Sequence, residues 1–142
     1  MINIEISLST HGLIETAIVK CDRKKRTLAI TMPSGLQREY SAADLYLCFG
    51  MLRADYPETK FLCKGAKLNV HPSRMSSQMS SGLVAYELEF GKPSEEENIV
   101  RIFDYEDNNI TNNIEDQQTF YKAWIDSLTI TTPSNPKNKL QD

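Results

Sequence analysis

Ile2-Asn3-Ile4-Glu5-Ile6-Ser7-Leu8 is the stretch that decides the fold of this chain. Its aliphatic and polar residues alternate strictly, which places four aliphatic side chains on one face of a strand and three polar side chains on the other. Residues 13–19 and 27–32 are also rich in β-forming residues, and the charged residues 22–26 between them suit a hairpin turn. We therefore expect three strands in an antiparallel meander.

Helical periodicity marks two longer segments further along the chain. Ser41 and Asp44 resemble a capping box, and apolar residues follow them at helical spacing, at Leu45, Cys48, Phe49, Leu52 and Tyr56. This pattern predicts a helix over residues 42–55, stopped by Pro57. A second apolar stripe predicts a helix over residues 114–128, formed by Ile114, Tyr121, Trp124, Ile125 and Leu128. The Asn-rich residues 108–113 should form a loop that caps this helix.

Shorter elements are expected between the two helices. Residues 61–63 predict a buried strand, residues 73–82 a short helix, and residues 84–90 with 99–103 a second hairpin. The fold class is therefore α/β (α+β), with a mainly antiparallel sheet of about five to six strands, two main helices and a short third helical segment. We expect residues 1–132 to form a single domain and residues 133–142 to form a flexible tail.

Length and composition agree with one small globular domain. The chain has 142 residues, of which 40% are hydrophobic and 25% are charged, and its apolar runs are too short to span a bilayer. The first five residues lack the basic start of a signal peptide. Three cysteines without CxxC spacing, Cys21, Cys48 and Cys63, indicate reduced, buried thiols. Together these features predict a cytoplasmic protein.

The residue types that enzymes use are sparse in this sequence. No HExxH or paired CxxC pattern offers a metal site, and no glycine-rich phosphate loop offers a nucleotide site, so we expect no metal and no cofactor. Only two histidines are present, and His11 lies in an expected turn. His71 lies close to Ser73, which leaves open a small hydrolase-like enzyme as an alternative. Our main expectation is that the protein is not an enzyme.

Charge is distributed unevenly along the chain. Residues 95–116 carry eight acidic residues against one basic residue, Arg101. Such a segment either forms an ordinary solvated surface or attracts a basic partner. Residues 104–109 are rich in oxygen ligands, but they lack the spacing and the glycine of an EF-hand calcium loop. The basic turn at residues 23–26 leaves open a nucleic-acid-binding module, although no aromatic residues are interleaved with its charges.

The central part of the chain resembles a known bacterial family. The resemblance covers more than a third of the sequence and is carried by Leu52-Arg53, Phe61-Leu62-Cys63-Lys64-Gly65-Ala66, Asn69-Val70-His71-Pro72-Ser73-Arg74-Met75, Met79-Ser80-Ser81-Gly82 and Tyr86. These residues are similar to a family that includes immunity proteins of contact-dependent growth inhibition systems. Within this segment, Met75, Met79 and Tyr86 are expected to pack into the core.

The resemblance implies a bacterial cytoplasmic protein that neutralises the C-terminal toxin domain of a delivered effector by tight binding. The toxin in such systems is often a nuclease. A nuclease has a basic substrate groove, and carboxylates of the immunity protein can occlude it. The expected partner-binding residues are then the acids of the acidic segment with the apolar residues beside them: Glu95, Glu96, Glu97, Asp104, Tyr105, Glu106, Asp107, Ile110, Glu115 and Asp116. No membrane partner and no direct nucleic-acid contact are expected.

Overall fold

The first two strands form a long hairpin at one end of the molecule. In the computed structural model, which describes residues 1–131, β1 (Ile2–Thr10) pairs antiparallel with β2 (Leu13–Asp22) along its whole length. The two-residue turn has positive φ at both positions, 51° at His11 and 85° at Gly12. This is the geometry of a type I′ turn, whose twist matches that of the paired strands. The alternating stretch therefore forms the strand that its pattern predicts.

Three further strands complete a five-stranded antiparallel sheet. These are β3 (Thr27–Thr31), β4 (Gln37–Ser41) and β5 (Thr59–Phe61), and the strand order is β4-β3-β2-β1-β5. The predicted meander is confirmed. The sequence pattern missed β4, because Tyr40 is its only buried residue and the strand lies at an edge of the sheet. It also placed the strand near Phe61 two residues too late.

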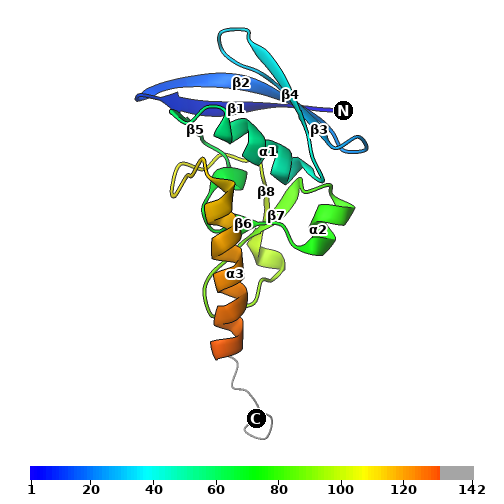
Figure 1. The fold of residues 1–142 in the computed structure, drawn as a ribbon, viewed down its shortest axis with the longest axis vertical. Helices are drawn as coiled ribbons and strands as arrows, with labels where there is room; N and C mark the ends of the chain where they lie inside the picture. Colours follow the sequence, from blue (N-terminus) through cyan, green and yellow to red (C-terminus); the bar gives the residue numbers. More distant parts are fainter. Residues whose placement is uncertain (132–142) are drawn as a thin grey trace, which may run out of the picture.

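Helix α1 (Leu45–Ala54) packs against the inner face of this sheet (Figure 1). Its N-cap is Asp44, whose Oδ1 accepts a hydrogen bond from the Leu47 N–H at 2.8 Å. The expected cap at Ser41 is wrong, since Ser41 is hydrogen-bonded into β4 as the last residue of that strand. The helix also ends before Pro57, with Asp55 as its C-cap.

A second, smaller sheet follows. It consists of β6 (Val70–His71), β7 (Val84–Glu87) and β8 (Ile99–Arg101) in the order β6-β7-β8, so the predicted second hairpin is confirmed with shorter strands. The 3₁₀ turn η1 (Lys64–Ala66) precedes it in the chain, and the 3₁₀ turn η2 (Glu96–Asn98) lies in the connection between β7 and β8. The fold is thus α+β, as expected, with its strands divided between two antiparallel sheets.

The short helix α2 (Arg74–Met79) begins at Ser73, whose hydroxyl accepts a hydrogen bond from the Ser76 N–H in a capping box. The expectation that its methionines pack into the core is wrong, because Met75 is 67% exposed and Met79 is 74% exposed. All other positions of α2 are polar, namely Arg74, Ser76, Ser77 and Gln78, so the helix has no wide apolar face to bury. Tyr86, the third residue expected in the core, is half-buried.

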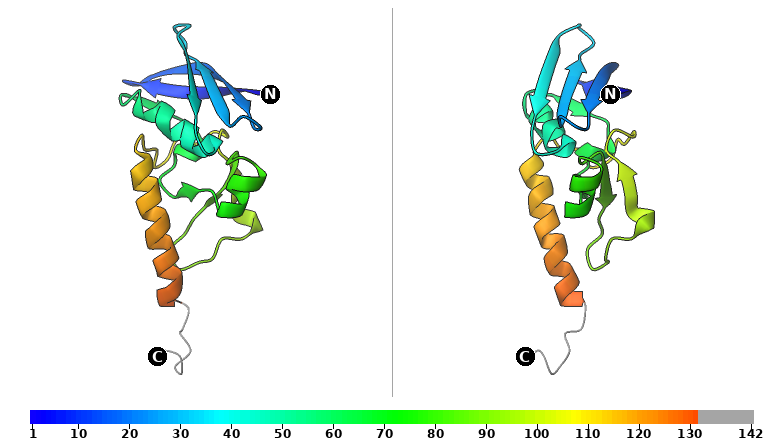
Figure 2. Two further views of the ribbon diagram at one scale, coloured as in Figure 1. Left: turned by 45° about the vertical axis from the view of Figure 1, so that its right-hand side comes forward. Right: turned by 90° about the vertical axis from the view of Figure 1, so that its right-hand side faces the viewer.

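The last described element is α3 (Ile114–Thr131), which confirms the predicted second helix. It begins near the N-terminal sheet and α1 and runs along the small sheet away from them (Figures 1 and 2). Trp124 is buried on its inner side, whereas Ile125, which the stripe assigned to the same face, is exposed. The expected tail at residues 133–142 lies outside the described residues.

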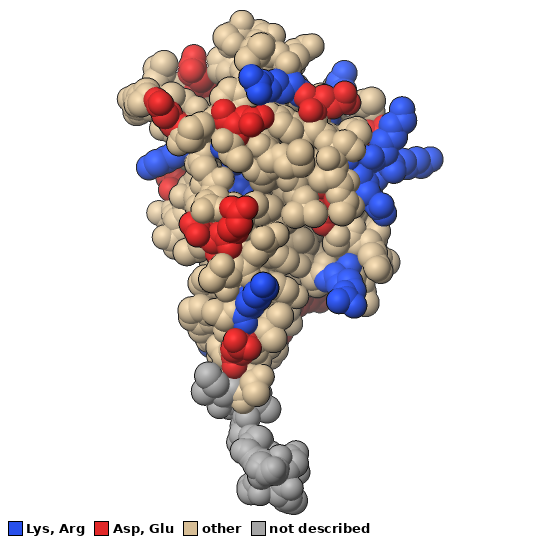
Figure 3. Space-filling model, in the orientation of Figure 1, with Lys and Arg blue, Asp and Glu red and all other residues tan. Residues whose placement is uncertain are grey.

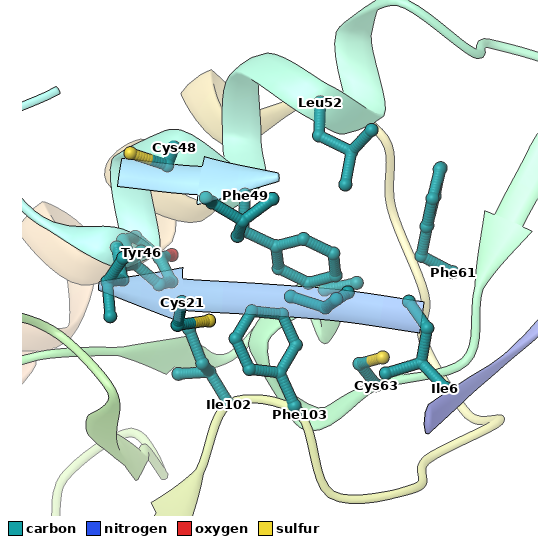
Figure 4. Close-up of a cluster of buried hydrophobic side chains, with 14 of the residues drawn as sticks. Ile6, Cys21, Tyr46, Cys48, Phe49, Leu52, Phe61, Cys63, Ile102 and Phe103 are labelled. Atoms are coloured by element: carbon teal, nitrogen blue, oxygen red, sulfur yellow. The ribbon is translucent and has the colours of Figure 1, made fainter. Parts of the chain in front are cut away.

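One hydrophobic core connects both sheets. Phe49 from α1 is its centre and makes edge-to-face contacts with Phe61 and Phe103, whose ring centroids lie 5.9 and 5.1 Å from its own (Figure 4). Each such fully buried aromatic ring contributes about 1.5–3 kcal/mol through loss of water contact. Cys21, Cys48 and Cys63 are free and buried, and burial raises the pKa of the Cys21 and Cys63 thiols to about 12. These thiols pack as small apolar groups.

A buried polar cluster attaches α3 and the loop before it to α1. Arg53 is fully buried and donates hydrogen bonds to the Thr111 carbonyl oxygen at 2.6 Å and to Gln117 Oε1 at 2.8 Å. Gln117 in turn donates to the carbonyl oxygens of Gly65 and Lys67. Burial lowers the pKa of the Arg53 guanidinium to about 10, which still leaves it charged at neutral pH. The cluster therefore fixes the start of α3.

Within residues 1–131, no helix combines the length and the apolar character needed to cross a bilayer.

Candidate partner-binding surface

The fold divides the acidic segment among several places. Glu95–Glu97 lie at η2 beside the small sheet, Asp104–Asp107 lie in the loop after β8, and Glu115 and Asp116 begin α3. Figures 1 and 2 place η2 and the start of α3 on different sides of the molecule. On the face in Figure 3 the acidic side chains are scattered, and several basic side chains lie together at the right-hand edge while others lie elsewhere. The expected single acidic surface is therefore corrected to separate groups.

Glu106 is used inside the molecule. Its side chain is 8% exposed, and its Oε1 accepts hydrogen bonds from the Nζ atoms of Lys64 and Lys67, each at 3.0 Å. Its Oε2 accepts from the backbone N–H groups of Asp107 and Asn108. Burial alone would raise the pKa of this carboxyl, but these hydrogen bonds prevail and lower the pKa to about 2. The expectation that Glu106 contacts a partner is corrected on this ground.

The neighbouring residues of this loop differ in solvent exposure. Asp104, Tyr105 and Asp107 are exposed, and the Tyr105 hydroxyl donates to Asp107 Oδ2 at 3.5 Å. Ile110, the expected apolar anchor, is half-buried against the core and forms a β-bridge with Lys67. Tyr105 is thus available to a partner, and most of the Ile110 side chain is not.

Glu115 and Asp116 are exposed in the first turn of α3. Negative charge at this position stabilises the helix, because it interacts favourably with the unpaired backbone N–H groups of the first turn. The Glu115 N–H donates to Asn113 Oδ1 at 2.9 Å, which confirms the expected cap in the Asn-rich loop. A structural role therefore accounts for these two acids.

Glu95 and Glu97 border a groove beside the small sheet, which we call the acidic groove. It has a volume of about 240 Å³ and is lined by Glu87, Glu89, Lys92, Pro93, Ser94, Glu95, Glu97 and Asn98. Asn98 fixes its wall, because its Oδ1 accepts the Glu95 N–H and its own N–H donates to the Glu95 carbonyl oxygen, each at 2.8 Å. Glu89 pairs with Lys92 at 3.1 Å. Glu95, Glu96 and Glu97 make no ion pair with any residue in 1–131.

An aromatic pair involves Phe90, which lies in the chain between the groove residues Glu89 and Lys92. Phe90 is 53% exposed and stacks on Phe120 of α3, with ring centroids 4.6 Å apart. The turn that carries Phe90 is tied to α3, because Trp124 Nε1–H donates to the Lys92 carbonyl oxygen at 3.0 Å. The sequence pattern missed this pair, since it assigned Phe90 to the end of a strand over residues 84–90. The only signal was Gly91, which has the positive φ of a turn.

The candidate catalytic pair lies in another pocket, of about 410 Å³, between α1 and α2. His71, Ser73 and the carboxylate of Asp44 all line it. His71 Nδ1 is bonded to the Pro72 carbonyl oxygen at 2.7 Å, and the Ser73 hydroxyl is bonded to Ser76. Within residues 1–131, no hydrogen bond joins His71 to a serine. The three groups converge, but not as a nucleophile with its base.

Two other features of the sequence can be located. Within residues 1–131, no group of three or more His, Cys, Asp or Glu side chains could hold a metal ion, and this covers the oxygen-rich residues 104–109. The basic turn between β2 and β3 is exposed at the edge where Figure 3 shows Lys and Arg. Its Arg23 donates to the Met79 carbonyl oxygen at 3.2 Å. His11, in the first hairpin turn, pairs with Glu58.

Comparison with known proteins finds no match to this chain among protein-family models or among curated proteins.

Proposed function

We propose that the protein is an inhibitory binding protein, an immunity protein that neutralises the basic toxin domain of a contact-dependent growth inhibition effector. The observation that carries the proposal is the acidic groove with the Phe90–Phe120 pair beside it. Glu95 and Glu97 hold negative charge that no described residue neutralises, on a backbone turn fixed by Asn98. Fixed charge of this kind accelerates encounter with a basic surface, such as the substrate groove of a nuclease.

Selectivity requires more than charge, and the aromatic pair supplies it. Exposed aromatic side chains that insert into a partner contribute disproportionately to binding energy, because they bury a large area at little entropic cost. Phe90 is held by its stack on Phe120 and by the turn that Trp124 fixes. It is therefore ordered before a partner arrives, which reduces the entropy lost on binding.

The test uses the toxin domain that the proposal expects to be encoded by the gene next to the gene of this protein. The double variant Glu95→Lys/Glu97→Lys should slow association with that domain by about tenfold at low salt and less at high salt. Phe90→Ala should instead increase the dissociation rate, by about thirtyfold for a loss of ~2 kcal/mol. Glu39→Lys, an exposed residue on β4, is the matched control and should change neither rate appreciably.

Two results would contradict the proposal. One is full protection of cells from the toxin by a protein that carries all three substitutions, since the groove would then not be the interface. The other is absence of toxin binding together with salt-dependent retention of nucleic acid on filters that is lost on removal of the basic turn charges. That outcome would favour the nucleic-acid-binding alternative, because phosphate contacts of Lys and Arg weaken steeply with salt.

A further inference from the structure

The pocket between α1 and α2, which we call the α1–α2 pocket, contains a buried carboxylate without a cationic partner. Asp44 is 4% exposed, yet it forms no ion pair with any described residue. Its Oδ1 accepts the Leu47 N–H and its Oδ2 accepts the Ser77 hydroxyl at 2.5 Å. Each carboxylate oxygen can accept more than one hydrogen bond, so both retain acceptor capacity. Buried charges in proteins are normally paired.

The backbone is shaped to hold this carboxylate. Gly82 has φ +79°, and a Cβ atom there would lie 2.8 Å from Asp44 Cγ. The preceding residue, Ser81, also has a positive φ of 56°, which is uncommon for a residue with a side chain. Its carbonyl oxygen accepts the Leu45 N–H at 2.7 Å. Strain of this kind persists where the surrounding structure enforces it, and it concentrates at functional positions.

His71 adds a second acceptor to the same pocket. Because the Pro72 carbonyl oxygen can only accept, the bond to His71 Nδ1 requires a proton on that nitrogen. In the neutral ring Nε2 therefore carries a lone pair, and no described residue donates to it. Burial of the ring lowers the pKa of His71, which favours this neutral form. The ring is held in place by stacking on Tyr121 at 4.0 Å and by edge contact with Tyr46 at 5.2 Å.

The rim of the pocket carries the opposite chemistry. Arg74 and Gln78, on the exposed side of α2, both line it. The Arg74 guanidinium makes no ion pair with a residue in 1–131. Guanidinium groups bind carboxylates through parallel hydrogen bonds. The α1–α2 pocket thus presents acceptors at its base and a cationic donor at its rim.

We propose that the α1–α2 pocket binds a small zwitterion, an amino acid or short peptide, with its ammonium group against Asp44 and His71 and its carboxylate against Arg74. The volume of about 410 Å³ is within the range of small-molecule pockets and suits a ligand of this size. The aromatic rings of Tyr46 and Tyr121 provide apolar surface for its carbon atoms. This pocket is lined by none of the residues of the acidic groove, so the inference is independent of the proposed function.

The experiment measures thermal shift for each of the twenty amino acids and a set of glycine-containing dipeptides, followed by calorimetry of those that bind. Asp44→Asn keeps a side chain that can cap α1 but removes the charge. Arg74→Gln removes the charge at the exposed rim. Each should weaken binding about 10- to 100-fold, as expected for loss of a charge-assisted hydrogen bond. Arg101→Gln, exposed on β8, is the matched control and should leave binding unchanged.

Modified ligands separate the two ends of the zwitterion. An N-acetylated form of the bound ligand should bind weakly and lose its dependence on Asp44, while the decarboxylated amine should lose its dependence on Arg74. The proposal is overturned if no probe binds at millimolar concentration, or if the amine alone binds as well as the zwitterion. Should Asp44→Asn fail to fold, Arg74→Gln with the decarboxylated amine decides the question. Both variants should still bind the toxin domain if the proposed function holds.

Discussion

At the scale of single residues, the buried groups that organise this protein are the ones that the sequence could not reveal. Arg53 falls between apolar positions of a predicted helix, where a solvent-exposed arginine is the ordinary expectation. Its partners Thr111 and Gln117 lie 58 and 64 residues further along the chain. No local pattern connects residues so far apart, and the same is true of Glu106 with Lys64 and Lys67. The oxygen-rich sequence around Glu106 indicated exposure, and the fold buried it.

Glu106 makes stability depend on pH in a defined window. Its folded-state pKa is about 2 against an ordinary value of 4.5, so the unfolded chain takes up the proton first as pH falls. Its stabilisation is therefore fully present above about pH 4.5 and is lost progressively toward about pH 2. Glu106→Gln should lower the free energy of unfolding by about 2 kcal/mol at pH 7, because charge-assisted hydrogen bonds are lost. Urea unfolding of both proteins at pH 7, 4 and 3 should show the difference shrinking.

Glu39→Gln provides the control for this pH effect, because Glu39 is exposed and forms no ion pair with a residue in 1–131. It should track wild type at every pH. An equal difference between wild type and Glu106→Gln at pH 7 and pH 3 would show that the carboxylate is not held by the lysines.

At the scale of elements, the sequence predicted strands and helices best where buried residues recur at a regular spacing, and it missed or misplaced elements where they do not. The strand β1 and the helix α3 were predicted because apolar residues recur at a spacing of two or at helical spacing. The strands β2 and β3 were predicted because they are rich in β-forming residues. The edge strand β4 has a single buried residue, so its pattern is indistinguishable from a loop. The start of α1 was misplaced because Ser41 and Asp44 are both residue types that cap helices. Ser41 is excluded as the cap only by its pairing in β4, which the sequence pattern did not predict.

The contact between α1 and α3 depends on a glycine that the helical pattern did not single out. A Cβ atom at Gly50 would overlap the side chain of Ile114, the first residue of α3. Gly50→Ala should gain up to about 1 kcal/mol in helix propensity. Overpacking should outweigh this gain and produce a net destabilisation of about 1–2 kcal/mol. Chemical denaturation of purified Gly50→Ala measures the balance directly.

A double-mutant cycle identifies the cause of that loss. Ile114→Ala removes Cδ1 and Cγ1, including the atom that the new Cβ would overlap most, and leaves only the Ile114 Cβ at 3.0 Å. Gly50→Ala should therefore be clearly less destabilising in that background than in the wild type. Additive effects of the two substitutions would mean that the helices do not touch at this point.

At the scale of the whole molecule, charge that is continuous in sequence is discontinuous in space. The expected interface treated the acids from Glu95 to Asp116 as one surface, but the fold separates η2 from the start of α3. Conversely, the acidic groove combines Glu95 and Glu97 with Glu87 and Glu89 from the strand end before them. The sequence could predict part of this site, namely the charge at Glu95–Glu97, but not which acids share a surface.

Both sheets share one core, and this predicts a single cooperative unfolding transition. Ile6 and Leu28 of the large sheet and Ala85 of the small sheet belong to the same buried cluster, joined through α1. Trp124, the only tryptophan, reports on α3 and the turn after β7, whereas far-ultraviolet circular dichroism reports on all strands and helices. Coincident urea midpoints from tryptophan fluorescence and circular dichroism are therefore expected.

The core variant Phe49→Leu tests the same coupling, because Phe49 contacts rings from both parts of the molecule, Phe61 of β5 and Phe103 after β8. It should shift both midpoints together, with a loss of about 1–2 kcal/mol since the substitution leaves a partly filled cavity. If the fluorescence midpoint moved while the circular dichroism midpoint stayed in place, the two sheets would be separate cooperative units. The small sheet, with the acidic groove and α3, could then unfold locally while the N-terminal sheet remains folded. The measured affinity for a partner would then include the free energy of that local unfolding.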